Sequence, residues 1–155
     1  MNHDRLIADY LAGPQLLRDT IAGMTPEQID SAPIPGKWST RQVICHIADF
    51  EPVYADRIKR VIVEDTPLLM SGDPDLFAAK LGYGQRDIEN ELQLIEVVRQ
   101  QVATILRTVP VETFQRIGKH STDGPLTIEQ LLTRITGHIP HHVRTIVEKR
   151  AALGL

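Results

Sequence analysis

Two histidines near the C-terminal end, His138 and His142, lie four residues apart in a segment whose apolar residues follow helical spacing. Residues four apart on a helix share one face, with Cβ atoms about 5–6 Å apart. Two imidazoles at this separation can bind one metal ion. The neighbouring apolar residues recur at the spacing of a buried helix face, which predicts that both histidines point into the core: Ile128, Leu131, Leu132, Ile135, Ile139 and Ile146.

A third histidine, His46, lies on or beside the apolar face of an earlier helical segment. An unsatisfied buried polar group costs on the order of 1–3 kcal/mol, so the imidazoles need hydrogen-bond partners or a metal. Either they are satisfied core histidines, or they form a three-histidine metal site with an open coordination position. Three protein ligands plus water is the catalytic pattern for zinc, and such a metal lowers the pKa of a bound water or thiol.

Several residues near these histidines are further candidates, each with two interpretations. Asp49 could orient the imidazole of His46 through its second nitrogen, or be a solvated helix carboxylate. His141 could act as a fourth ligand or an outer base, or lie at the edge of the apolar face. Trp38 could contact a ligand, or cover the start of the helix that follows it. Cys45 is expected to be a packing residue, because consecutive helical residues point about 100° apart.

Two arginines are candidates to bind an anionic substrate. Arg99 interrupts the apolar face of its helix, where it either extends its charged end to solvent or reaches a polar pocket, and Arg116 lies in an irregular connection. The connection Glu64–Gly84 is rich in turn signals and is long for a compact domain, which is typical of a segment that covers a site.

Four long segments carry helical spacing: residues 4–24, 39–63, 86–108 and 127–153. Capping boxes mark the starts of the second and the fourth, at Ser39 and Thr127. Pro14 is expected to kink or divide the first helix, and Pro140 to bend the last. No strand-like alternation exceeds a few residues. We therefore predict an all-α protein, a four-helix bundle forming a single domain over residues 1–155, with metal ligands on facing helices.

Composition narrows the classes of partner. The formal charge is −3, no stretch is strongly basic and aromatics make up 5% of the residues, so no nucleic-acid partner is expected. The chain shows no apolar run of about eighteen residues and no leader at Met1, so we expect no membrane span and a cytoplasmic protein. The single cysteine, Cys45, excludes an internal disulfide.

Five short motifs follow one another in an order that resembles the DinB/YfiT-like superfamily. The resemblance extends from about residue 5 to residue 150. The motifs are Gly36-Lys37-Trp38-Ser39, His46-Ile47-Ala48-Asp49, Arg116-Ile117-Gly118-Lys119-His120, Gly124-Pro125-Leu126-Thr127 and His138-x-x-His141-His142.

The resemblance implies an up-down-down-up four-helix bundle, often a homodimer, that binds a divalent metal through three histidines. The matching ligands are His46, His138 and His142, whereas His141 matches a family histidine that is usually not a ligand. Pro140 departs from the polar or aromatic residue expected between the histidines. The superfamily includes S-transferases that use low-molecular-weight thiols, a mycothiol-dependent isomerase and proteins described as metal-dependent hydrolases.

Two hypotheses about function follow. In the first, zinc or nickel activates a thiolate or water against a small electrophilic substrate; by family analogy we prefer transfer of a low-molecular-weight thiol to hydrolysis. In the second, the chain is a non-catalytic, dimerising stress or binding bundle whose histidines are structural.

Overall fold

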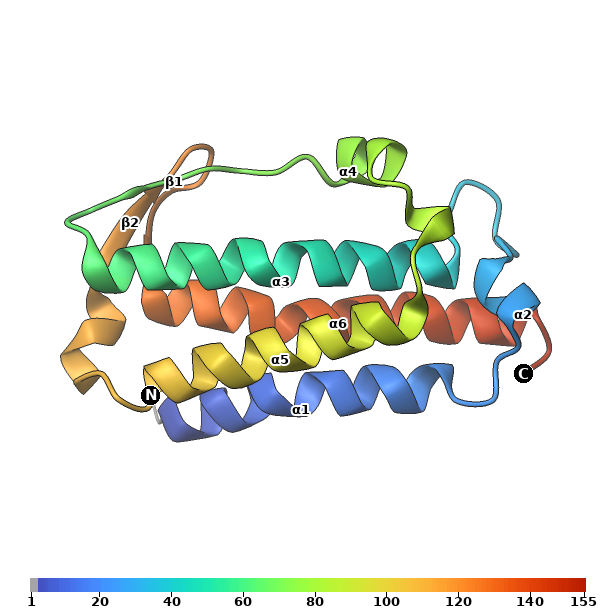
Figure 1. The fold of residues 1–155 in the computed structure, drawn as a ribbon, viewed down its shortest axis with the longest axis horizontal. Helices are drawn as coiled ribbons and strands as arrows, with labels where there is room; N and C mark the ends of the chain where they lie inside the picture. The colour runs from blue at the N-terminus through green and yellow to red at the C-terminus, as the bar shows by residue number, and fades with distance from the viewer. Residues whose placement is uncertain (1–2) are drawn as a thin grey trace.

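Four long helices form the body of the protein in the computed structural model, which describes residues 3–155 (Figure 1). The first and last run in one direction and the middle two run in the opposite direction, which confirms the up-down-down-up bundle. Each of α1 and α3 packs against both α5 and α6. The four helices are α1 (His3–Ile21), α3 (Thr40–Val63), α5 (Ile88–Leu106) and α6 (Ile128–Ala152).

The starts of α3 and α6 are the capping boxes that the sequence predicted. Ser39 and Thr127 each accept a hydrogen bond from the backbone N–H three residues later, and a glutamine side chain at that position accepts one in return. Helix α1 continues through Pro14, so of the two expected outcomes, a kink or a division, the division does not occur. Helix α6 likewise continues through Pro140. Within residues 3–155, no helix combines the length and the hydropathy needed to cross a membrane.

Short elements occupy the connections. They are the helices α2 (Pro26–Asp30) and α4 (Pro74–Lys80), the 3-10 turns η1 (Tyr83–Gln85) and η2 (Val111–Gln115), and the strands β1 (Leu68–Leu69), β2 (Ile117–His120) and β3 (Gly124–Thr127). The strands form one sheet in the order β1-β2-β3, with β1 parallel and β3 antiparallel to β2. The sequence reading missed this sheet, because strands of two to four residues are too short to show alternation.

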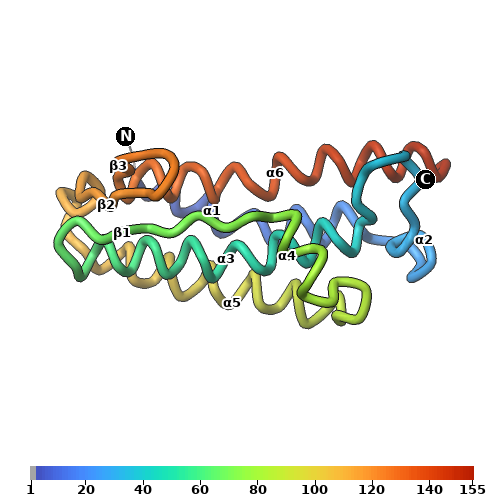
Figure 2. The backbone as a smooth tube through the Cα atoms, turned by 90° about the horizontal axis from the view of Figure 1, so that it is seen from above, coloured from blue at the N-terminus to red at the C-terminus, as the bar shows by residue number. Residues whose placement is uncertain are grey.

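The connection from α3 to α5 extends along the bundle. Seen from above, it lies over α3 and passes through β1 and α4 before α5 begins (Figure 2). Its residues Ser71, Gly72 and Pro74 line one cavity together with residues of α3 and α6. A side chain at Gly72 would meet the ring of Phe50 at 3.3 Å, so the connection lies directly against α3. The long connection between the parallel helices α3 and α5 therefore forms one wall of the cavity.

The core contains a closed polar cluster between two groups of apolar residues. Arg99 of α5 and Glu51 of α3 form an ion pair in which both side chains are fully buried. Arg99 also donates hydrogen bonds to the backbone oxygens of Tyr10 and Ile135, at 2.7 and 3.0 Å. This cluster links α1, α3, α5 and α6. Gly13 makes room for it, because a Cβ there would lie 2.3 Å from Nη1 of Arg99.

Candidate metal centre

Three histidines from two facing helices converge at one point. The Nε2 atom of His138 lies 3.0 Å from Nε2 of His46 and 3.2 Å from Nε2 of His142. One ring nitrogen from each histidine lies within 4.8 Å of the other two. His138 and His142 are one turn apart on α6, and His46 faces them from α3. The structure thus brings together the three residues that the sequence proposed as metal ligands.

The spacing of these nitrogens suits a single metal ion. Zinc–nitrogen bonds of about 2.0–2.1 Å in a tetrahedral site place the ligand nitrogens about 3.3 Å apart. Two of the three separations, 3.0 and 3.2 Å, lie close to this value, and all three nitrogens lie within 4.8 Å of one another. If all three Nε2 atoms carry lone pairs, they repel one another unless a cation or a shared proton lies between them. The residues therefore fit a divalent cation.

The electrostatic environment keeps the three imidazoles neutral. Burial lowers the pKa of His46 to about 4, of His142 to about 3 and of His138 to about 2. Repulsion from a neighbouring histidine in its protonated form lowers the pKa values of His138 and His142 further. A neutral imidazole has a free lone pair, which is the form that binds a metal.

The second nitrogens of two ligands have no partner among the described residues. Nδ1 of His46 and Nδ1 of His138 are both buried without a hydrogen bond. No hydrogen bond joins Asp49 to His46: Oδ1 of Asp49 accepts from Nη1 of Arg86 at 2.8 Å, and its Oδ2 is buried without a hydrogen-bond partner among the described residues. Arg86 also pairs with Glu91 and so ties α3 to the start of α5. No local sequence pattern indicated Arg86, since its partner on α3 lies 37 residues away.

Trp38 and His141 lie on one side of the three histidines. The ring centroid of Trp38 is 5.2 Å from that of His46, and Trp38 lines a cavity of about 260 Å³ with His141, His142 and Lys149. His141 is exposed, and its Nδ1 lies 3.3 Å from Nη2 of Arg144. It is not among the three converging histidines, although its ring centroid lies 5.0 Å from that of His142.

The two arginines proposed to bind substrate lie away from the three histidines. Arg99 belongs to the closed cluster and has no exposed surface. Arg116 donates to the backbone oxygens of Val61 and Glu64, at 2.8 and 2.7 Å, and so fixes the β2–β3 hairpin to the end of α3. Neither lines a cavity with the histidines.

A second cavity of about 300 Å³ reaches the histidines from the other side. Its lining includes His46 and Phe50 of α3, His138 of α6, and two residues that were not predicted to form the site, Arg57 and His120. The sequence indicated His120 only as the last residue of the motif Arg116-Ile117-Gly118-Lys119-His120. Arg57 had only its spacing, which puts it on the same face of α3 as His46.

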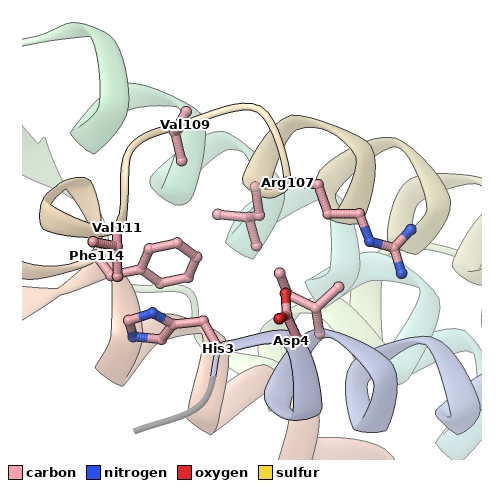
Figure 3. Close-up of a pocket in the computed structure, with 8 residues that line it drawn as sticks. His3, Asp4, Arg107, Val109, Val111 and Phe114 are labelled. Carbon is pink, nitrogen blue, oxygen red and sulfur yellow. The ribbon is translucent and has the colours of Figure 1, made fainter.

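The largest of the described cavities lies apart from the histidines. It measures about 520 Å³ and includes His3, Arg107, Val109 and Phe114 in its lining (Figure 3). The imidazole of His3 stacks on the ring of Phe114 with centroids 3.9 Å apart. None of its lining residues is shared with the two cavities beside the metal centre.

Comparison with known proteins identifies relatives along nearly the whole chain. A profile of the DinB superfamily matches residues 10–146. A protein of Oceanobacillus iheyensis named "putative metal-dependent hydrolase" is 31% identical over 133 residues, which cover 86% of this chain and 77% of that protein. A protein of Bacillus licheniformis with the same descriptive name is 26% identical over 152 residues, covering 97% of this chain and 86% of that one.

The solved structure of YfiT from Bacillus subtilis superposes with a TM-score of 0.91 at 27% sequence identity. The superposition covers 97% of this chain and 87% of YfiT. That structure is described as having an unusual four-helix bundle topology.

Proposed function

The chain belongs to the DinB superfamily, and from that premise we propose that it is a divalent-metal-dependent enzyme acting on a small molecule. The observation that carries the proposal is the convergence of Nε2 of His46, His138 and His142, of which His46 and His138 line one cavity and His142 lines another. A structural zinc site is closed by four protein ligands, whereas three ligands with access from a cavity leave a position for a reactant. The names of the relatives from Oceanobacillus and Bacillus support dependence on a metal.

For the reaction, we propose transfer of a low-molecular-weight thiol to a small electrophile. A divalent cation held by three imidazoles lowers the pKa of a water or thiol that binds to it. Among the described residues, no carboxylate is hydrogen-bonded to the three imidazoles, and Asp49 is held by Arg86. A thiol, with an ordinary pKa of about 8.5, needs far less help from a base than water does.

The thiol comes from outside the protein in this proposal. Cys45 is fully buried, and burial raises the pKa of its thiol to about 11. Its Sγ lies 3.7 Å from the backbone oxygen of Tyr83, the only hydrogen bond of this side chain among the described residues. A nucleophile must be exposed and ionised, and Cys45 is neither.

Hydrolysis is the second candidate, favoured by the names of the relatives. The chain's own contribution is the same in both reactions: three neutral imidazoles hold the cation, while Phe50 and Trp38 pack against His46 with ring centroids 4.8 and 5.2 Å away. The two candidates differ only in whether thiol or water attacks.

The test begins with the metal content of untagged protein and of a His46→Ala/His142→Ala double variant. We expect about one zinc or nickel per chain, lost in the double variant and kept in His141→Ala, the matched control on α6. The metal-loaded protein is then assayed for loss of free thiol with a panel of small thiols and a small electrophile, and for ester hydrolysis without thiol. Thiol consumption supports transfer, and hydrolysis without thiol supports the second candidate. Absence of metal, with no uptake of added zinc or nickel, overturns the enzyme proposal.

A further inference from the structure

The cavity of about 300 Å³ between α3, α6 and the β2–β3 hairpin contains a buried positive group, Arg57, that forms no ion pair with a carboxylate among the described residues. We infer that Arg57 and His120 form an anion-binding subsite, which holds a carboxylate or phosphate group of the substrate while its reacting end lies at the three histidines. This inference rests on the proposed function and names the class of substrate: an elongated small molecule with an anionic terminus.

Arg57 is placed for this role by helix geometry. It lies eleven residues after His46, three turns of α3, so both side chains share one face at a Cα separation of about 16 Å. Its Nη2 donates to the backbone oxygen of Met70, and its guanidinium lies 4.8 Å from the ring centroid of Tyr54. The side chain is only 5% exposed.

Arg57 forms no ion pair with any carboxylate among residues 3–155, and its Nε is buried without a hydrogen-bond partner. The other buried arginine, Arg99, is fully paired with Glu51. A buried charge without a counter-ion is costly, and an arginine offers a planar fork of donors that matches carboxylate and phosphate oxygens. An anion in the cavity supplies the missing counter-charge.

Asp123 attracts Arg57 electrostatically but forms no ion pair with it. Asp123, on the hairpin that faces α3, is already paired with Arg134 of α6. The charged side chains lining this cavity are thus two arginines and one aspartate, which leaves one net positive charge with His120 neutral.

His120 contributes a second donor. The backbone N–H groups of Thr122 and Asp123 point at its Nδ1, at 3.4 and 3.3 Å, so Nδ1 is an acceptor and the neutral ring carries its proton on Nε2. The hydrogen bonds of the His120 ring within the described part of the chain are all made through Nδ1, so Nε2 is the nitrogen left to donate to a ligand. His120 lines the same cavity as Arg57 and is 7% exposed.

The wall between the two ends of the cavity is aromatic. Phe50 and Tyr54 of α3 lie between His46 and Arg57 in sequence and line the cavity with them. Phe50 packs on His46 with ring centroids 4.8 Å apart, and the guanidinium of Arg57 lies over the ring of Tyr54. The substrate class is therefore an apolar or aromatic spacer with an anion at one end and the reacting group at the other.

The experiment titrates metal-free, chelator-treated protein with inorganic phosphate and, separately, with acetate, following backbone amide shifts by NMR. Arg57→Gln should weaken binding of the preferred anion by about tenfold or more, as expected for loss of a charge-assisted hydrogen bond. His120→Gln should weaken it to a smaller extent. The matched control is Arg60→Gln, three residues along α3, where the arginine is exposed and paired with Asp56 and Glu64; its affinity should equal that of the wild type.

The two probes distinguish the two sources of charge: tighter binding of acetate assigns a carboxylate, and tighter binding of phosphate assigns a phosphate. Binding of neither anion, or equal affinities in Arg57→Gln and Arg60→Gln, overturns the subsite. Circular dichroism checks that each variant folds. If Arg57→Gln does not fold, the anion affinities of His120→Gln and Arg57→Lys are measured instead. Unchanged affinity in both variants overturns the inference.

Zinc uptake by the same proteins separates this inference from the proposed function. Arg57→Gln should bind as much zinc as the wild type, because Arg57 is not one of the converging ligands. Zinc uptake without anion binding contradicts the anion subsite and is consistent with the proposed metal enzyme. Anion binding without zinc uptake contradicts the proposed metal enzyme and is consistent with the anion subsite.

Discussion

The bundle contains two buried polar clusters that share helix α3 but differ in how their polar groups are satisfied. Around Arg99, the guanidinium, the Glu51 carboxylate and two backbone oxygens satisfy one another. Around His46, three ring nitrogens converge, and two further ring nitrogens have no partner among the described residues. The first cluster is complete as folded, whereas the second needs a ligand to be complete.

This difference distinguishes a polar cluster that stabilises the fold from one that can bind a ligand. Both clusters interrupt apolar helix faces, and no local sequence pattern distinguishes Arg99 from the histidines. The closed cluster links four helices, so it acts on the stability of the fold. The histidine cluster borders two cavities, so it is where a small molecule can reach buried polar atoms.

The largest effect is expected from opening the closed cluster. Glu51→Leu leaves Arg99 buried without its counter-charge, which should lower the free energy of unfolding by about 3–5 kcal/mol. Urea denaturation measures it. The double variant Glu51→Leu/Arg99→Met removes both charges and should recover much of the loss. A single variant as stable as the wild type would show that the pair contributes nothing.

The next effect concerns the histidine cluster and its ligand. Zinc at about 100 times its dissociation constant should raise the free energy of unfolding by about 2.7 kcal/mol, because it binds only the folded state. Thermal melting with zinc and with chelator measures the difference. The His46→Ala/His142→Ala variant should show none of it, while His141→Ala keeps it. The same melting temperature in zinc and chelator would contradict a metal centre.

The smallest effect is a change in pH dependence. Burial lowers the pKa of His142 to about 3 in the folded protein, against about 6.5 in the unfolded chain. The unfolded chain therefore binds the proton first, and the stability of the metal-free protein falls as the pH decreases from 6.5 towards 3. His142→Asn should reduce this slope by up to about 1.4 kcal/mol per pH unit.

Urea titrations of chelated protein at pH 6, 5 and 4 measure that slope. Between pH 7.5 and 8.5 the imidazole is neutral in both states, so the two slopes should agree there and provide the internal control. Equal slopes below pH 6 would mean that His142 is not buried in neutral form.

Much of the fold could be predicted from local patterns. Apolar spacing located the four long helices, and the capping boxes at Ser39 and Thr127 marked the first residues of α3 and α6. The pairing of His138 with His142 followed from one helical turn. The hairpin was missed because strands of four residues carry too little pattern, and Pro14 did not divide its helix.

The sequence by itself determined which residues lie on one helix face, because that depends only on the 3.6-residue repeat. It placed His46, His138 and His142 on inward faces for this reason. Only the tertiary structure decided which polar residues meet: Arg99 finds Glu51 across 48 residues, and Asp49 finds Arg86 across 37. Which polar residues pair depends on how separate helices pack. Arg99 therefore pairs with Glu51 in the core, whereas Arg57 lines a cavity and forms no ion pair among the described residues.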